Sequence, residues 1–280
     1  MQKTRLFIIF LALIVLATPV KTFAGFPIGK YRDIVVPSFN YYRQTDRFDG
    51  NDKVIKGPPG TSFTSYSSTL FIGYGITRRL DLIMNVPFLY QVNNLGQNGK
   101  IVDQGPGDFV GGLSYNLVNW GYTKFLSVQA SAIVPLYSKI NGENTALGLG
   151  DYGTEVKLMF CGSLPKLIAD KGYFNTELTY RRYFDTQGPD QVSFMATVGY
   201  PVTKHNQVSV DLTFYRSYSS NKAFDPNIFT ARDYAFFKPQ LNVGHQFSRR
   251  ASLFIGGYYV PFGLNTGVGY GGSVLFVFKL

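Results

Sequence analysis

The chain has 280 residues, 45% of them hydrophobic and 16% aromatic, and its formal net charge is +10. The positive charge does not point to nucleic acid, because the sequence has no arginine-rich run and no aromatic RNA-binding motif. The single cysteine, Cys161, excludes an internal disulfide, so the fold must be held together without cross-links.

The N-terminus has the three-part pattern of an export signal. Lys3 and Arg5 precede an apolar run over 6–17, and a small-residue site ends at Ala24. The run is too short to span a bilayer, so we predict a secretory signal peptide over 1–24 rather than an uncleaved anchor helix. The mature chain, 25–280, is then a single domain with a net charge of +7, since the leader carries three of the cations and no acid.

Segments in which every second residue is apolar fill the mature chain and predict strands. We expect twelve, over 33–47, 62–77, 80–92, 108–119, 122–138, 151–161, 173–185, 191–203, 207–218, 233–248, 251–261 and 268–280. No helical periodicity competes with them. Most are longer than the roughly 9 to 11 residues that a tilted strand needs to cross a membrane.

The connections between these strands alternate in length. Those after the second, fourth, eighth and tenth strands are tight, and those after the first, third, fifth and ninth are long and polar. The sixth is of medium length, and the seventh and eleventh are short. Such alternation is typical of outer-membrane barrels, which have short periplasmic turns and long external loops. The even strand number then places both termini on the periplasmic side.

Alternation alone fits a soluble sandwich as well as a barrel, but two features favour the barrel. Aromatic residues gather near strand ends, as interfacial girdles require. The last strand stays alternately apolar up to Leu280 and is similar to the assembly signal of such barrels, with Leu in place of the usual Phe. We therefore predict an all-β fold, a transmembrane antiparallel β-barrel of about 12 strands and of outer-membrane type.

A Gly-x-Gly-Asp turn occurs twice, each time at the start of an alternating strand. The residues are Gly105, Gly107 and Asp108, and Gly148, Gly150 and Asp151. With the twelve-strand pattern, these turns resemble the family of outer-membrane proteins named after the MetA-pathway of phenol degradation. Its members look like barrels that help hydrophobic or aromatic compounds cross the outer membrane. The resemblance implies an outer-membrane channel or transporter for passive passage of small solutes, hydrophobic or aromatic ones among them.

By strand parity, Asp108 and Asp151 both point into the lumen at the extracellular rim. They could attract or gate solutes, since rings of charge set selectivity in pores. They could also cap backbone donors at a corner where glycine supplies a positive φ. We favour the corner interpretation and keep the gating role as the alternative.

Six charged residues lie on the polar faces of the central strands and form the predicted solute path: Glu155, Lys157, Glu177, Arg181, Asp211 and Lys238. We expect Glu155 and Lys157 at the height of Glu177, with Arg181 nearer the outside. Such charges either pair to fill a narrow barrel or line a wet constriction. A twelve-strand barrel has an intermediate size, so both possibilities stay open.

Other chemistries receive little support. The acidic stretch 46–52 departs from the calcium-loop spacing, so we predict no metal and no cofactor. Outer-membrane phospholipase A is a barrel of comparable length that needs a Ser, a His and an Asn. Here only His205 and His245 occur, and neither is in the His-x-Ser arrangement of that family. We predict a protein that is not an enzyme, with a lipid hydrolase or a non-conducting structural barrel as alternatives.

The expected location is the outer membrane of a bacterial cell. The expected partners are outer-membrane lipid and lipopolysaccharide, the barrel assembly machinery through the C-terminal strand, and a small solute.

Overall fold

The computed structural model describes residues 26–137, 147–165, 171–185, 188–220 and 232–280. The predicted signal peptide lies outside these residues. No helix in the described ranges is long and apolar enough to cross a membrane.

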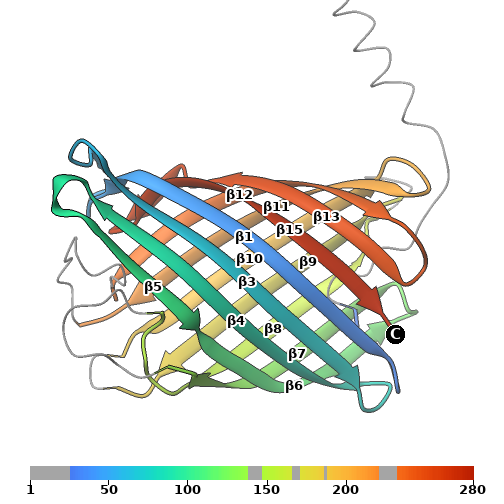
Figure 1. Cartoon of the computed structure of the whole chain (residues 1–280). Coiled ribbons are helices and arrows are strands. Elements are labelled where there is room, and N and C mark those ends of the chain that lie inside the picture. Colours follow the sequence, from blue (N-terminus) through green and yellow to red (C-terminus); the bar gives the residue numbers. More distant parts are fainter. Residues whose placement is uncertain (1–25, 138–146, 166–170, 186–187, 221–231) are drawn as a thin grey trace, which may run out of the picture.

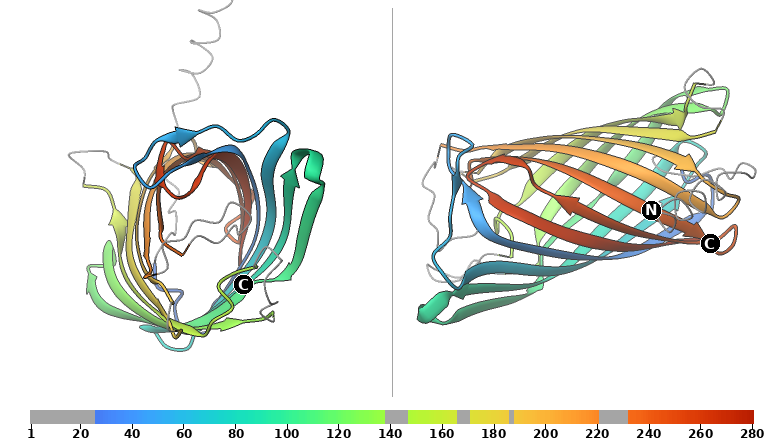
Figure 2. Two further views of the ribbon diagram at one scale, coloured as in Figure 1. Left: turned by 90° about the vertical axis from the view of Figure 1, so that its left-hand side faces the viewer. Right: turned by 90° about the horizontal axis from the view of Figure 1, so that it is seen from above.

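Twelve long antiparallel strands close into one barrel (Figure 1; Figure 2, left). They are β1 (Asp33–Phe48), β3 (Thr61–Gly75), β4 (Leu80–Leu95), β6 (Asp108–Trp120), β7 (Lys124–Pro135), β8 (Gly153–Ser163), β9 (Tyr173–Tyr183), β10 (Asp190–Pro201), β11 (Asn206–Tyr218), β12 (Tyr234–Gln246), β13 (Ala251–Tyr259) and β15 (Gly267–Lys279). Each pairs with its neighbour in chain order, and β15 pairs with β1 to close the ring. All twelve predicted strands are confirmed.

Three short strands and one turn of 3-10 helix escaped the prediction: β2 (Val54–Ile55), β5 (Lys100–Pro106), β14 (Phe262–Leu264) and η1 (Gly96–Asn98). They lie in the connections that the prediction treated as loops. β2 pairs with β1, and β5 pairs with β4. The ladders of these barrel strands therefore continue into the connections.

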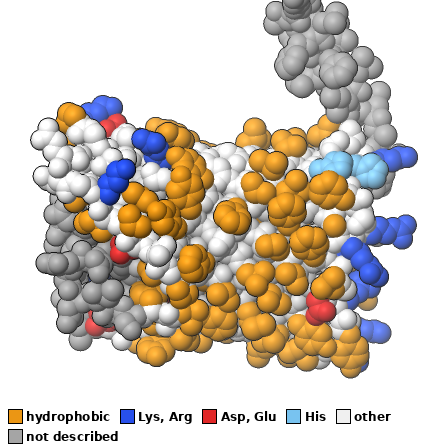
Figure 3. Space-filling view, in the orientation of Figure 1, with side chains coloured by type: hydrophobic (Ala, Val, Ile, Leu, Met, Phe, Trp, Pro, Cys, Tyr) orange, Lys and Arg blue, Asp and Glu red, His pale blue; other side chains and the backbone are white. Residues whose placement is uncertain are grey.

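The wall of the barrel is apolar outside and polar inside. Leu241 and Val243 point outward and are 59% and 56% exposed, whereas Asn242 between them is only 7% exposed. Among the described residues, buried polar side chains outnumber buried apolar ones. Hydrophobic side chains cover much of the wall in Figure 3. A soluble sandwich would show the opposite, so the alternation belongs to a membrane-type barrel.

The two ends of the barrel differ. We call the end that holds the connections after β1, β4, β7, β9, β11 and β13 the loop end, and the other the turn end. The turn end holds the connections after β3, β6, β8, β10 and β12, and Leu280 lies beside it (Figure 1). The medium-length connection between β8 and β9 is thus at the turn end, and the short one between β9 and β10 is at the loop end.

The start of the described chain enters the lumen at the turn end. The Phe26 ring packs edge-on against the buried Phe125, with centroids 5.1 Å apart. The Ile28 amide donates to Oδ2 of the buried Asp81 at 3.1 Å. Gly75 permits this path, since a Cβ there would collide with the backbone of Gly29. The first described residues therefore lie against the inner wall at the turn end of the lumen.

Pro239 lies in the middle of β12, where the ladder with β11 continues and the ladder on the opposite side is broken. β12 pairs with β13 from Gln240 onward and with β14 only up to Phe237. Lys238 and Pro239 thus lie between the two ladders. A proline cannot donate a ladder hydrogen bond, and the break removes the need for one.

Candidate functional site

A cavity of about 970 Å³ occupies the loop half of the lumen. Its lining combines aromatic rings with polar and charged side chains. Among the lining residues are Tyr42, Phe63, Asp108, Arg181, Tyr183, Gln191, Tyr215, Tyr234, Phe236, Lys238 and Tyr258. We call this cavity the vestibule.

Flat aromatic rings form two parts of the vestibule wall. Tyr215 on β11 lies nearly parallel to Tyr234 (5.5 Å, 11°) and to Phe236 (5.2 Å, 2°) on β12. Tyr42 on β1 lies parallel to Tyr258 on β13, with centroids 6.5 Å apart and an interplanar angle of 10°. Such faces can contact a planar apolar solute.

These aromatic residues were not among the predicted site residues, although the sequence holds a signal for them. They occupy inward positions of their strands, opposite to the outward aromatics of the wall. A Cβ at Gly267 or at Gly269 of β15 would collide with Tyr42 or with its partner Gln44. A run of alternating glycines beside inward aromatics therefore indicates a place where rings lie flat on the wall.

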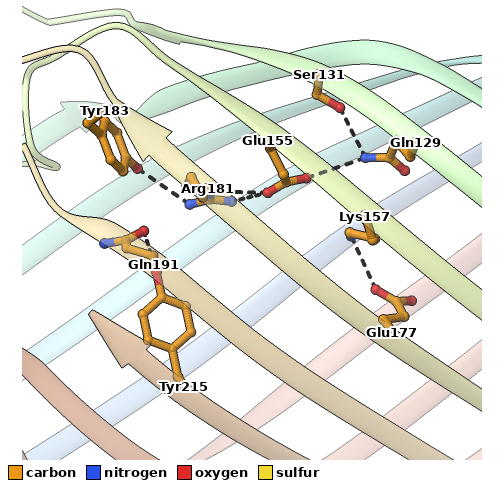
Figure 4. Close-up of polar contacts among 9 residues, drawn as sticks. All are labelled: Gln129, Ser131, Glu155, Lys157, Glu177, Arg181, Tyr183, Gln191 and Tyr215. Carbon is orange, nitrogen blue, oxygen red and sulfur yellow. Dashed lines mark hydrogen bonds and ion pairs between the residues drawn. The ribbon is translucent and has the colours of Figure 1, made fainter. Parts of the chain in front are cut away.

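The predicted charges Glu155 and Arg181 form an ion pair (Figure 4), in which Arg181 also lines the vestibule. They are direct cross-strand partners on β8 and β9. Arg181 donates to Glu155 Oε2 through Nη2 at 2.5 Å and through Nε at 3.1 Å. Gln129 donates to the other carboxylate oxygen at 3.4 Å. The Glu155 carboxylate is almost fully buried beneath Arg181 and Gln129, and the pair lies on the inward faces of β8 and β9.

Lys157 and Glu177 form a second pair, closer to the turn end, with 3.1 Å between Nζ and Oε2. Asn175 also donates to Glu177 at 3.0 Å. The register corrects the predicted heights: Glu155 is level with Arg181, whereas Glu177 lies opposite Met159. Arg181 lies nearer the loop end than Lys157 and Glu177, as expected, but the expectation that Glu155 lies at the height of Glu177 was wrong.

Asp211 and Lys238 belong to a different part of the wall, on β11 and β12. Asp211 accepts a hydrogen bond from Asn242 Nδ2 at 2.7 Å. The Lys238 ammonium lies 4.8 Å from the centre of the Tyr258 ring and forms no ion pair with any residue that the structure describes. The six charges thus form two ion pairs and a separate group, in which Lys238 faces the vestibule.

The two Gly-x-Gly-Asp turns are joined by Tyr137. Its hydroxyl donates to Asp108 Oδ1 at 2.9 Å and accepts from the Gly150 amide at 2.8 Å. Burial, and then the Asp108 carboxylate, raises the pKa of the Tyr137 phenol above its usual range, so the donor proton is retained. Gly150 has φ +70°, and a Cβ at Gly148 would collide with the Tyr137 hydroxyl. Glycine is therefore required at these two positions by the backbone conformation and by the lack of space for a Cβ.

The two rim aspartates have different surroundings. Asp108 lines the vestibule. Asp151 is buried and lies 3.8 Å from Arg232, which also pairs with Asp185 at 3.0 Å. Arg232, between β11 and β12, thereby joins its own connection to two others of the loop end.

The acidic stretch 46–52 uses its carboxylates on its own neighbours. Asp49 accepts from the amides of Asn51 (2.8 Å) and Lys53 (2.9 Å), and these two donors lower its pKa. Asp46 pairs with Lys56 at 2.8 Å. Within the described residues, no three or more His, Cys, Asp or Glu side chains are grouped to hold a metal ion.

The two histidines are exposed at the turn end, with ring centroids 6.3 Å apart. His245 Nδ1 lies 2.7 Å from the side-chain oxygen of Asn206. The nearby Ser248 hydroxyl accepts from the amides of Arg250 and Ala251, both at 3.1 Å, and so caps a turn. Of the Ser, His and Asn that a lipid hydrolase needs, a His and an Asn are in contact, whereas the nearby Ser248 caps a turn.

Neither a protein-family model nor a curated protein matches the sequence. Among solved structures, the crystal structure of an outer membrane channel from Pseudomonas putida F1 is similar with TM-score 0.75 and 12% identity, over 93% of this chain and 100% of that one. The β domain of the Bordetella autotransporter BrkA is similar with TM-score 0.56 and 10% identity, over 90% of this chain and 100% of that one. The NanC porin is similar with TM-score 0.53 and 10% identity, over 88% of this chain and 100% of that one.

At these identities the likeness shows the fold alone, a closed antiparallel barrel of the outer-membrane type. The resemblance to the family named after the MetA-pathway of phenol degradation stays a prediction.

Proposed function

We propose that the protein is an outer-membrane channel for passive passage of small solutes. The observation that carries the proposal is a closed barrel, apolar outside, whose lumen holds a vestibule of about 970 Å³ lined by aromatic and charged side chains. The structural likeness to an outer membrane channel and a porin supports it. In this orientation the loop end faces the outside and the turn end faces the periplasm.

We also propose that the solutes include hydrophobic or aromatic compounds. The parallel rings of Tyr215, Tyr234 and Phe236 offer an apolar face inside an otherwise polar lumen. A solute that binds there would then pass the ion pair of Glu155 and Arg181. Stacking of this kind contributes about 1 kcal/mol per ring pair, enough to favour entry without trapping the solute.

Current recordings on the refolded protein in planar bilayers test both parts of the proposal. Phenylalanine and leucine carry the same charges, so they serve as matched probes added at the loop end. We expect a steady ion current that phenylalanine interrupts more often than leucine, and we expect Tyr215→Ala to remove the difference. Tyr66→Ala, on the exposed outer wall, is the matched control. Absence of current would favour a non-conducting barrel, and equal interruption by both probes would reject the aromatic site.

A lipid hydrolase is the second candidate, and the contact between His245 and Asn206 is the observation that favours it. We expect no hydrolysis of phospholipid vesicles by the refolded protein. Hydrolysis that His245→Ala abolishes would replace the channel proposal by an enzymatic one.

A further inference from the structure

Three turns at the turn end are built on one plan: 77–80, 203–206 and 248–251. Each begins with a hydroxyl residue, Thr77, Thr203 or Ser248, whose oxygen accepts from the two amides that lie two and three residues further on, at 2.9 to 3.2 Å. The first residue of each turn also donates its amide to the carbonyl of the fourth. The rigid frame leaves the two middle side chains free to project.

The middle positions are basic in all three turns. They hold Arg78 and Arg79, Lys204 and His205, and Arg249 and Arg250, and all six are exposed. Between the turn of β12 and β13 and that of β3 and β4 lie the end of β15 and the start of β1, with Lys279 and Arg32. We call the five turn cations Arg78, Arg79, Lys204, Arg249 and Arg250 the basic rim. Lys and Arg side chains gather along this edge in Figure 3.

The turn cations of the basic rim are not neutralised by ion pairs within the described residues. None of its five cations forms an ion pair with any part of the chain that the structure describes. Two acids lie near these turns: Asp81, which is buried and accepts from the Ile28 amide, and Asp33 at the start of β1, which forms no ion pair with a cation of the rim. Like charges fixed along one edge repel each other, so this surface fits an anionic partner.

Aromatic residues mark the depth at which the basic rim lies. Tyr74, Tyr200 and Phe247 point outward, are 37%, 41% and 59% exposed, and come one to three residues before the hydroxyl of each turn. Outward aromatics of this kind lie at the bilayer interface. Long basic side chains directly beyond them reach the lipid phosphates.

We propose that the basic rim is a binding surface for the phosphate groups of anionic phospholipids in the periplasmic leaflet. The proposal rests on the membrane placement given under Proposed function, but it does not require that the barrel conducts. A lipid surface fits better than a soluble acidic protein, because the cations follow the circumference of the wall together with the aromatic girdle.

Native mass spectrometry of the full chain in micelles with equal amounts of phosphatidylglycerol and phosphatidylcholine tests the proposal. We expect the wild type to retain phosphatidylglycerol preferentially. Each charge at a membrane surface changes affinity by about fivefold, so Arg78→Gln/Arg249→Gln/Arg250→Gln should reduce the preference by about tenfold or more. The matching Lys substitutions should keep it. The control Arg43→Gln/Lys53→Gln/Lys100→Gln, made of exposed cations of the loop half, should leave it unchanged.

The heat-modified gel mobility of each variant verifies that the barrel is folded. An unchanged lipid preference in the folded Arg-to-Gln variant would overturn the proposal. So would an equal loss in the loop-half control, or displacement of the lipid by inorganic phosphate at the same phosphate concentration, which would indicate a site for free anions. Binding of a soluble polyglutamate with no lipid preference would point to an acidic protein instead.

Discussion

The two ends of the barrel differ in how many of their charged side chains form ion pairs. At the loop end, acids and bases neutralise each other: Lys56 with Asp46, Arg182 with Asp190, Arg216 with Asp233, and Arg232 with Asp185. At the turn end, the five cations of the basic rim have no ion pair with the residues described. Four cations of the loop end are thus neutralised by acids of the same chain, whereas the cations of the basic rim are exposed to whatever surrounds the turn end.

We expect the cations that have ion-pair partners to contribute to folding stability, and the cations of the basic rim to contribute to binding. Removing a cation that has an ion-pair partner in the loop half should leave that partner unpaired and lower the free energy of unfolding. Removing one from the basic rim should leave that free energy almost unchanged, because no partner is lost.

The largest effect is expected for Arg181→Ala, which leaves the buried carboxylate of Glu155 without its ion pair. We expect a loss of about 3 kcal/mol in the free energy of unfolding. The matched variant Arg250→Ala should lose less than about 0.5 kcal/mol. Urea unfolding in phosphatidylcholine vesicles measures both, and equal losses would break the comparison between the two ends.

The Tyr137 bridge at the loop end gives the second prediction. Gly148→Ala places a methyl group against the Tyr137 hydroxyl, so we expect a cost of about 1 to 3 kcal/mol. Gly257→Ala is the control, since its nearest neighbouring atom would be 3.9 Å from the new Cβ, and it should be nearly neutral. The same urea titration applies, and a neutral Gly148→Ala would show that the bridge between the two turns is not tightly packed.

A smaller effect is expected for Arg182→Ala. Its pair with Asp190 lies on the outer surface, with side chains 47% and 35% exposed. Exposed pairs contribute about 0.2 to 1 kcal/mol, so the loss should stay below about 1 kcal/mol and should shrink as salt is added. If Arg182→Ala lowered the free energy of unfolding as much as Arg181→Ala does, solvent exposure would not explain the strength of these two ion pairs.

The smallest effect concerns the pH dependence of the first loop. The pKa of Asp49 is lowered by the amides of Asn51 and Lys53, so its contribution to loop order is complete above the unfolded pKa of about 4 and is lost as pH falls through the folded value. Hydrogen exchange at the Asn51 and Lys53 amides, corrected for intrinsic rates, should accelerate below that range. The Gly96 amide, held by the amide oxygen of Asn94 at 3.2 Å, is the control that should not respond. A parallel response of Gly96 would indicate general unfolding.

The sequence predicted the strands because a barrel wall repeats one rule, apolar outward and polar inward, along every strand. It could not predict the level of Glu155 against Arg181, since register depends on the connection between β8 and β9, whose medium length fixes no turn type. The vestibule aromatics were missed because the predicted solute path was chosen from charged residues on the inward faces alone. The role of Tyr137 requires two distant turns to meet, which no local pattern contains.

The most direct test of the central claim, that solutes pass through the lumen below the vestibule, is the single-channel conductance of Glu155→Ala/Arg181→Ala. Removing both members of the pair leaves no unpaired buried charge, so stability should remain within about 1 kcal/mol of the wild type. Because the two side chains lie on the inward faces of β8 and β9, their truncation to Ala should widen the path, and we expect the conductance to rise about twofold or more. An unchanged conductance in the folded double variant would contradict the claim.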